Sequence, residues 1–225
     1  MKFLLAGHAG SWNRGCEAIL RTTIMILRKE FGKSEIVISS FNRKNDKLID
    51  FGQNIKIIPS HLKNIWKRWT WQWALRQIYK IYSKSESWQM EFLPIISAIK
   101  WADVVISVGG DNYSMDYGFP SYYLNLNRLI KEKGKKLVIW GASIGPFPQD
   151  EKVEEIIDNL RLADLITVRE TRSFNYLTQL GIAANVKLVA DPAFLLPLEP
   201  VSLRGTWPNT SKDIVGLNVS TVRFV

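Results

Sequence analysis

The sequence predicts an α/β protein with a Rossmann-like parallel sheet flanked by helices. Short apolar runs alternate with segments of helical periodicity along most of the 225 residues, as in repeated strand–helix units. Several of these runs are continuously apolar, which is typical of parallel strands buried on both faces. Several of them also end in polar, glycine-bearing loops, at the position where open α/β sheets bind their ligands.

The composition describes a globular protein with excess positive charge. Hydrophobic residues make up 46% of the chain, and 30 Lys and Arg against 21 Asp and Glu give a formal net charge of +9. This balance favours anionic partners such as phosphorylated substrates, nucleic acid or an anionic lipid surface. A single cysteine excludes an internal disulfide, and two distant histidines leave no zinc-type cluster, so we expect no metal site. We expect a cytoplasmic protein, because the first apolar run is too short for a signal peptide and none reaches the ~20 residues of a spanning helix.

The first predicted strand, 3–6, ends in a glycine-rich loop that leads into a helix. The helix is predicted from apolar residues at helical spacing: Cys16, Leu20, Ile24, Leu27 and Phe31. The loop, 7–15, therefore lies at a helix N-terminus, where free backbone N–H groups suit a phosphate or carboxylate. It contains neither the dinucleotide fingerprint nor a Walker loop. We expect Gly7, Asn13 and Gly15 to bind substrate.

Three side chains at this loop each have two interpretations. Cys16 is a packed thiol or a nucleophile. Glu17 is a first-turn partner of the helix dipole or a site carboxylate, and as the latter it is a candidate for substrate binding and catalysis. His8 is an exposed or capping residue, or an acid/base group.

The rest of the chain is organised around residues 104–116. An apolar run at the start of this stretch predicts a buried parallel strand, which ends in Gly109, Gly110, Asp111 and Asn112. The glycines let a ligand approach bare backbone, and the two polar side chains offer donors and acceptors beside them. The loop is a ligand site or a tight turn. As a ligand site, all four residues contact substrate, and Asp111 is the second catalytic candidate.

The remaining elements continue the alternation. Further strands are predicted at 35–40, 55–58, 136–140, 165–168 and 186–189, and further helices at 86–100, 121–133, after Asp150 and from Thr171 to Gly181. The last three strands end at more candidate substrate-binding residues: Gly141, Ser143, Gly145, Arg169 and Asp191. Because carboxyl ends of parallel strands meet at one edge of a sheet, we expect these loops to converge with the first two. Arg169 pairs a phosphate or carboxylate, or it bridges to Glu170 or Asp164.

A tryptophan-rich basic segment, 56–84, contains no acidic residue. Leu62, Trp66, Trp69 and Trp73 follow one predicted helical row, with lysines and arginines around it. We expect an anionic membrane surface to be contacted by Trp66, Lys67, Arg68, Trp69 and Trp73. The alternative is that the tryptophans pack onto the domain and the lysines are solvated. Nucleic acid is disfavoured, because no binding module accompanies the segment.

The composition also predicts a domain boundary. Residues 1–200 form the expected N-terminal domain, and the proline-rich stretch 201–212 is a linker. An apolar run follows within 213–225 and predicts the first strand of a second domain. We therefore expect the chain to be the first domain of a larger protein, with the second domain largely missing.

Five stretches together resemble the polysaccharide pyruvyl transferase family. They are Asn13-x-Gly15-x-Glu17-Ala18-Ile19-Leu20, Asp103 to Asp111 (DVVISVGGD), Gly141-x-Ser143-Ile144-Gly145-Pro146, Val168-Arg169-Glu170-x-x-Ser173 and Asp191-Pro192-Ala193-Phe194. Each stretch is weakly specific alone, but the five occur in the family's order. The resemblance covers nearly all of residues 1–200.

The resemblance implies a two-domain architecture similar to that of the GT-B glycosyltransferases, with a cleft between the domains. It implies transfer of pyruvate from phosphoenolpyruvate to two hydroxyls of a saccharide, as a ketal on a cell-surface polysaccharide or its lipid-linked precursor. No cofactor is implied, and a lipid-linked acceptor would place the protein at the inner face of a membrane. The family's donor-binding arginine and histidine lie in the second domain, which this chain lacks.

Two rival functions remain open at this stage. A nucleotide-sugar glycosyltransferase would present a similar first domain to its acceptor. A non-catalytic module that binds polysaccharide or membrane would use the same surfaces without turnover.

Overall fold

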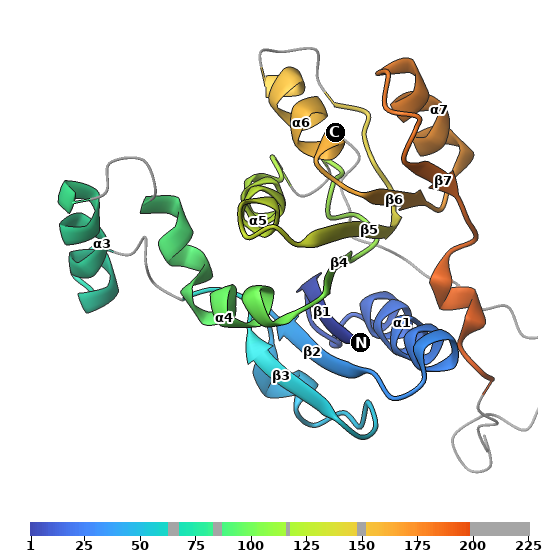
Figure 1. The fold of residues 1–225 in the computed structure, drawn as a ribbon, viewed down its shortest axis with the longest axis horizontal. Coiled ribbons are helices and arrows are strands. Elements are labelled where there is room, and N and C mark those ends of the chain that lie inside the picture. Colours follow the sequence, from blue (N-terminus) through green and yellow to red (C-terminus); the bar gives the residue numbers. More distant parts are fainter. Residues whose placement is uncertain (63–67, 83–86, 116–117, 148–151, 199–225) are drawn as a thin grey trace, which may run out of the picture.

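The computed structural model describes residues 1–62, 68–82, 87–115, 118–147 and 152–198. Within these ranges, seven parallel strands form one sheet, in the order β3-β2-β1-β4-β5-β6-β7 (Figure 1). The strands are β1 (Lys2–His8), β2 (Glu35–Ser40), β3 (Ile55–Pro59), β4 (Val104–Val108), β5 (Lys136–Ala142), β6 (Leu165–Val168) and β7 (Val186–Leu188). The chain order reverses between β1 and β4, which creates a crevice at the carboxyl ends of these neighbours.

Helices cover the sheet on both faces. They are α1 (Arg14–Phe31), α2 (Arg43–Asp46), α3 (Trp71–Tyr82), α4 (Leu93–Trp101), α5 (Ser121–Glu132), α6 (Lys152–Arg161) and α7 (Thr171–Gln179), with 3-10 turns η1 (Ser87–Phe92) and η2 (Pro192–Leu195). Helix α1 lies on one face, whereas α4 and α5 lie on the other. Right-handed crossovers impose this division, because the chain moves outward from β1 in one direction and from β4 in the opposite one.

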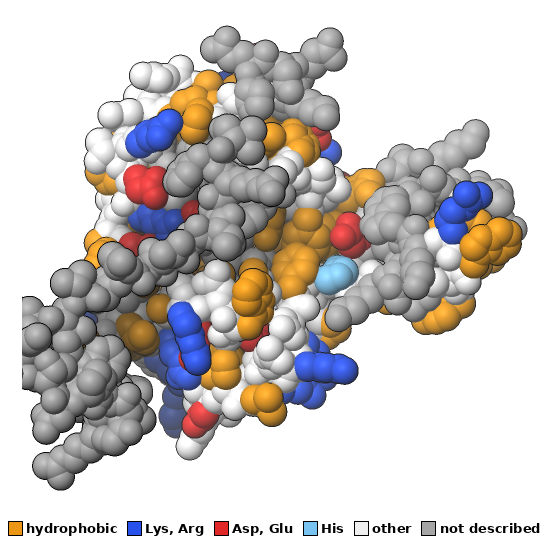
Figure 2. Space-filling view, turned by 180° about the vertical axis from the view of Figure 1, so that it is seen from behind, with side chains coloured by type: hydrophobic (Ala, Val, Ile, Leu, Met, Phe, Trp, Pro, Cys, Tyr) orange, Lys and Arg blue, Asp and Glu red, His pale blue; other side chains and the backbone are white. Residues whose placement is uncertain are grey.

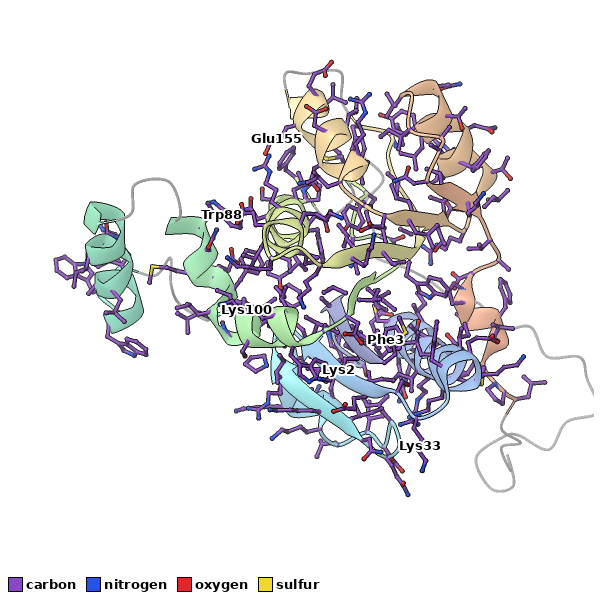
Figure 3. All side chains as sticks on the ribbon, viewed as in Figure 1. Lys2, Phe3, Lys33, Trp88, Lys100 and Glu155 are labelled. Carbon is purple, nitrogen blue, oxygen red and sulfur yellow. The ribbon has the colours of Figure 1, made fainter. Side chains whose placement is uncertain are left out.

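Strand β1 shows how the sheet separates two apolar cores. Phe3 and Leu5 pack on the side of α1, where Figure 3 shows Phe3. Leu4 and Ala6 point to the other face and join the core beneath α4, α5 and α6. All four are buried. Burial on both faces of the sheet therefore accounts for the apolar residue at each of these four positions. The predicted fold class is confirmed.

Helix α1 begins where its sequence provides a cap. The side chain of Asn13 accepts hydrogen bonds from the backbone N–H groups of Gly15 (2.9 Å) and Cys16 (3.2 Å). Arg28 and Lys29 lie in the last turn, where they suit the negative end of the helix dipole, and Gly32 ends the helix at positive φ. These signals fix the N-terminus of α1 beside the end of β1.

Two local features differ from the sequence analysis: no helix was predicted between β2 and β3, and His8 was predicted to lie in the loop 7–15. The polar stretch after β2 contains α2, whose buried Asp46 accepts hydrogen bonds from the Ser11 backbone N–H (2.8 Å) and from the Ser40 hydroxyl. His8 Nε2 lies 3.3 Å from the same carboxylate, so His8 is the buried end of β1 and not an exposed loop residue. Burial opposes ionisation of Asp46, but these hydrogen bonds outweigh it and hold its pKa far below the ordinary range.

The tryptophan-rich helix begins later than predicted. Thr70 precedes α3 and caps its start, because its hydroxyl oxygen accepts a hydrogen bond from the Trp73 backbone N–H (3.2 Å). Trp69 has φ of +66°, a left-handed conformation that an α-helix does not accommodate. Leu62 and Trp69 are therefore not on a helical row with Trp73. The predictions for Trp66, Lys67, the Asp150 cap, the linker 201–212 and the strand in 213–225 fall outside the described residues.

At the amino ends of the strands, Asp164 joins β5, β6 and α5. Its carboxylate accepts hydrogen bonds from Lys131 Nζ (2.7 Å), the Leu137 N–H (2.8 Å) and Lys136 Nζ (2.9 Å). Burial alone would raise the pKa of Asp164, but these three donors outweigh it and lower the pKa to about 2. The carboxylate therefore stabilises the fold above its unfolded pKa of about 4, and this contribution is lost as the pH falls toward 2.

We expect Asp164→Asn to lower the free energy of unfolding by about 1 kcal/mol at pH 7, after discounting for solvent screening. The difference from wild type should shrink between pH 4 and pH 2. Urea unfolding followed by tryptophan fluorescence measures both values. Asp158→Asn is the matched control, because the Asp158 side chain is 71% exposed and pairs within one helix turn. A constant difference down to pH 2 would contradict the assignment.

Candidate functional site

A cavity of about 500 Å³ opens at the carboxyl ends of β1 and β4, where the strand order reverses. Its walls come from the loop before α1, the start of α1, the central loop after β4 and the start of α5. The residues that line it include Trp12, Asn13, Gly15, Cys16, Gly110, Asp111, Asn112, Phe119, Tyr122, Tyr123 and Arg169. Two loops that the sequence predicted to converge therefore form one site.

Arg169 lies directly after β6 and joins the loops that follow three other strands. Its Nη2 donates to Asp111 Oδ1 (2.7 Å), its Nη1 to Asp191 Oδ2 (2.8 Å) and its Nε to Ser143 Oγ (3.0 Å). The partners follow β4, β7 and β5, so one guanidinium joins the ends of four neighbouring strands. We call Asp111, Arg169, Glu170 and Asp191 the rim. Of the predicted bridges, Glu170 is 3.6 Å from Nε, while Asp164 is engaged at the other end of the sheet.

The rim is acidic, not cationic. Three carboxylates, those of Asp111, Glu170 and Asp191, surround the single guanidinium of Arg169. Asp111 and Arg169 are the only charged side chains among the described residues that line the cavity. Arg169 is already neutralised by its own partners, so the local charge disfavours a phosphate. The expectation of an anionic ligand shared by all the loops does not fit this charge balance, which suits hydroxyl groups instead.

Asp191 and Asp111 both pair with Arg169, but they differ in how many of their carboxylate oxygens are engaged within the protein. Asp191 uses Oδ1 to accept the Ala193 N–H (2.8 Å), which caps η2, so both of its oxygens are engaged. Asp111 uses Oδ1 for Arg169, and its side chain is 43% exposed toward the cavity. Asp111 is therefore the carboxylate positioned to accept a proton or hydrogen bond from a ligand.

Two glycines allow this close packing. A Cβ on Gly110 would lie 2.6 Å from Arg169 Nη1, inside the contact distance of the two atoms. Gly141 has φ of +60°, and a Cβ there would lie 2.8 Å from Pro192 Cδ. Any larger residue would displace the guanidinium in the first case and η2 in the second.

Several predicted ligand residues support the rim from behind. The Asn112 side-chain amide donates to the carbonyls of Gly7 (3.2 Å) and Val108 (3.2 Å), which fixes the ends of β1 and β4 to each other. Ser143 donates to Glu170 Oε1 (2.7 Å) and accepts from Arg169, and its backbone N–H donates to the Gly110 carbonyl. Residues Gly7, Gly109, Gly141, Ser143, Gly145 and Asp191 do not line the cavity.

The structure does not bring Glu17 into the site. Its two carboxylate oxygens accept hydrogen bonds from Arg14 (2.6 Å) and Arg21 (2.8 Å), and it is absent from the cavity wall. Burial opposes the ionisation of Glu17, but the two arginines outweigh it and lower its pKa. Cys16 is half-buried at the wall, where burial and the charge of Asp111 raise its pKa, so it remains a thiol.

Sequence reasoning missed an aromatic wall. Trp12, Phe119, Tyr122 and Tyr123 also line the cavity. Burial raises the pKa of both tyrosines well above the ordinary range, so they stay protonated. The Tyr122 hydroxyl donates to the Ser60 carbonyl (3.1 Å), which fixes its ring. The signal in the sequence was the aromatic cluster at the start of α5, only a few residues after the central loop.

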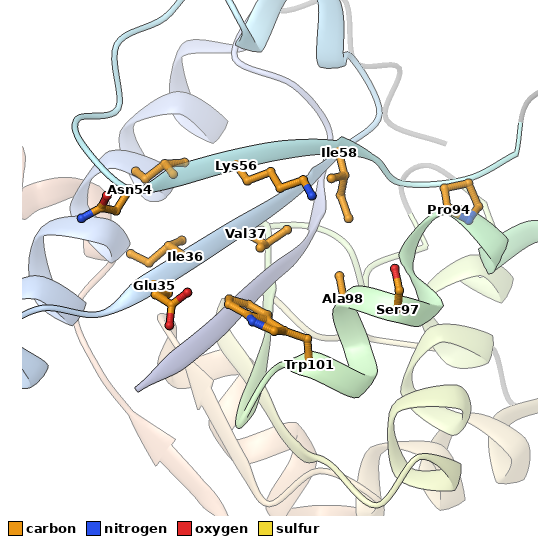
Figure 4. Close-up of a pocket in the computed structure, with 11 residues that line it drawn as sticks. Glu35, Ile36, Val37, Asn54, Lys56, Ile58, Pro94, Ser97, Ala98 and Trp101 are labelled. Atoms are coloured by element: carbon orange, nitrogen blue, oxygen red, sulfur yellow. The ribbon is translucent and has the colours of Figure 1, made fainter.

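A larger hollow lies elsewhere and does not compete for this role. Its volume is about 720 Å³, and Figure 4 shows it between β2, β3 and α4. Lys56 and Trp101 line it from the strand and helix sides. Residues such as Glu35, Ile36 and Ile55 place it toward the amino ends of the strands. Open α/β sheets bind ligands at the carboxyl ends, so the smaller cavity is the candidate site.

No group of three or more His, Cys, Asp or Glu side chains in the described ranges is arranged to hold a metal ion. None of the helices that the structure describes is both long and apolar enough to cross a bilayer.

Comparison with known proteins gives one family match and several similar solved structures. A family model described as polysaccharide pyruvyl transferase matches residues 13–217. A comparison with curated proteins finds no match. The apo form of the lipopolysaccharide outer core galactosyltransferase WaaB is a similar solved structure, with 20% identity and a TM-score of 0.47 over 94% of this chain and 50% of that chain. Another is described as a UDP-N-acetylglucosamine 2-epimerase from Listeria monocytogenes, with 12% identity and a TM-score of 0.46 over 82% of this chain and 44% of that chain. The present chain spans about half the length of these two proteins.

Proposed function

Because the chain belongs to the polysaccharide pyruvyl transferase family, we propose that the whole protein transfers pyruvate from phosphoenolpyruvate to a saccharide acceptor. The product is a ketal on a cell-surface polysaccharide or on its lipid-linked precursor. Two sugar hydroxyls form C–O bonds to the enol carbon, and its bond to phosphate breaks. One hydroxyl proton ends on the methylene carbon, which becomes a methyl group, and the other leaves with phosphate. The reaction balances without a cofactor.

The cavity beside Asp111 supports the acceptor half of this proposal. Aromatic side chains and the carboxylate of Asp111 line the same cavity, and this combination suits a sugar ring, which has apolar faces and an edge of hydroxyls. The observation that carries the proposal is that Asp111 is held by Arg169 and exposed to the cavity. Asp111 can then accept the proton of the attacking hydroxyl as a general base.

The same charge balance argues against binding the donor at this rim. Phosphoenolpyruvate carries a phosphate and a carboxylate, and both require cations. Arg169 is the one cationic side chain on the described cavity wall, and it is paired with Asp111 and Asp191. We therefore assign the acceptor to this cavity and the donor's anionic groups to a part of the whole protein outside the described residues.

We also place the whole protein on the cytoplasmic side of a membrane, where phosphoenolpyruvate and a lipid-linked acceptor meet. The single cysteine and the family assignment support this location.

Release of inorganic phosphate tests the proposal. The whole protein is incubated with phosphoenolpyruvate and a panel of saccharide acceptors, and phosphate is measured with and without each acceptor. Acceptor-dependent release together with a product heavier by one pyruvate ketal is the expected result. Release of a uridine nucleotide from a nucleotide sugar instead would replace the proposal with glycosyl transfer. Binding of saccharide without either release would indicate a non-catalytic module.

A further inference from the structure

Helix α3 stands apart from the rest of the molecule. Figure 1 shows it at the left end, beyond α4 and away from the sheet. It contacts η1, and half-buried Trp73 and Gln77 lie one turn apart on it. The packing of the two main cores involves other elements, so α3 is not needed to complete either of them.

The exposed stripe of α3 is apolar. Trp71 (65% exposed), Leu75 (45%) and Ile78 (52%) are spaced as i, i+4 and i+7, so they form one row along the helix. Trp69 lies just before the helix, is 88% exposed, and has its ring 6.1 Å from that of Trp73. We call Trp69, Trp71, Leu75 and Ile78 the apolar stripe. An amphipathic helix normally buries such a row, whereas here the row faces outward.

The sequence that contains the stripe is basic. Residues 63–84 contain six Lys or Arg and no Asp or Glu. Arg68, next to the stripe, is exposed and belongs to this set. Figure 2 shows hydrophobic and basic side chains together at the end of the projecting arm. Tryptophan and basic residues beside an exposed aliphatic row are the combination that binds the interface of an anionic bilayer.

We propose that the apolar stripe inserts into the headgroup region of an anionic membrane, with Arg68 against the lipid phosphates. A second copy of the chain is a poorer occupant, because two arms of the same strong positive charge would repel each other. The stripe is also only four side chains long, far below the ~20 residues a side of a stable protein interface. This surface is independent of the saccharide cavity, which lies at the ends of β1 and β4.

Vesicle co-sedimentation tests the proposal with the full chain. Vesicles of phosphatidylcholine with one-third phosphatidylglycerol are compared with vesicles of phosphatidylcholine alone. We expect the double variant Leu75→Glu with Ile78→Glu to reduce partitioning onto the anionic vesicles at least tenfold. Leu48→Glu is the matched control, because Leu48 is 85% exposed on another part of the surface, and it should bind as wild type does. Circular dichroism and thermal unfolding should be the same for all three proteins.

Three outcomes would overturn the proposal. The first is wild-type protein that stays in solution with anionic vesicles. The second is equal loss of binding in the Leu48→Glu control, which would show that bulk charge alone is responsible. The third is a concentration-dependent dimer of wild type that the double variant lacks, since the stripe would then be covered by a second copy. Phosphate release with a water-soluble acceptor should be unchanged in the double variant, so failure here is distinguishable from failure of the proposed reaction.

Discussion

Arg169→Gln is expected to lower the free energy of unfolding by about 2 kcal/mol at pH 7, because it removes the cation that pairs with the carboxylates of Asp111, Glu170 and Asp191. The Arg169 side chain is 18% exposed, and it donates charge-assisted hydrogen bonds of 2.8 Å or less to Asp191 and Asp111. Glutamine is shorter and uncharged, so it replaces neither bond. The remaining carboxylates of Asp111, Glu170 and Asp191 then repel one another.

The salt dependence distinguishes this cause from lost packing. Salt weakens both the attraction of Arg169 for its carboxylates in the wild type and the repulsion among the carboxylates in the variant, whereas it leaves packing unchanged. Urea unfolding at pH 7 in about 0.05 M and about 0.5 M NaCl should therefore show a smaller difference from wild type at the higher salt concentration. Arg172→Gln, at an exposed position on α7, should change stability by less than about 0.5 kcal/mol. An equal loss of stability in Arg169→Gln at both salt concentrations would contradict the electrostatic explanation.

Asp111→Asn is expected to lower the turnover number of acceptor-dependent phosphate release by about 10²- to 10⁴-fold, the usual contribution of a general base. Asparagine has almost the same shape, so the cavity keeps its form, but it cannot accept a proton from the attacking hydroxyl. The KM for phosphoenolpyruvate should change little, because the donor is assigned to a different part of the protein.

Asp191→Asn provides the matched control. Asp191 also pairs with Arg169, at 2.8 Å compared with 2.7 Å for Asp111, but it does not line the cavity. Its loss should destabilise the rim to a similar degree and leave most of the turnover. Steady-state kinetics and urea unfolding are measured on both variants of the whole protein. Similar turnover in the two variants would mean that Asp111 acts only by holding Arg169.

The strand-end rule made much of the site predictable. The polar residues after β1, β4, β5, β6 and β7 were expected to meet, and Arg169 joins Asp111, Ser143 and Asp191 in the structure. The glycine positions were informative for the same reason. Gly110 leaves room for a guanidinium that comes from a segment 59 residues further along the chain. Binding of substrate by these residues remains a prediction.

The errors arose where long-range contacts override local pattern. Nothing in the sequence near His8 indicates that Asp46, from a polar stretch, lies against it. Glu17 is in a family-like motif, yet Arg14 and Arg21 on the same helix engage both of its oxygens. The charge of the rim was misjudged because the net charge of the whole chain, +9, does not give the local charge at the ends of the strands.

The long-range hydrogen bonds of Arg169 also determine at which stage of folding the site can form. Asp111 is 58 residues before Arg169, and Asp191 is 22 residues after it. The rim therefore has no local nucleus, because no continuous segment shorter than that from β4 to β7 contains all of its parts. Entropy opposes closing such long loops until the intervening strands have docked. Arg169 can therefore reach all three of its partners only after β4, β5, β6 and β7 have docked side by side.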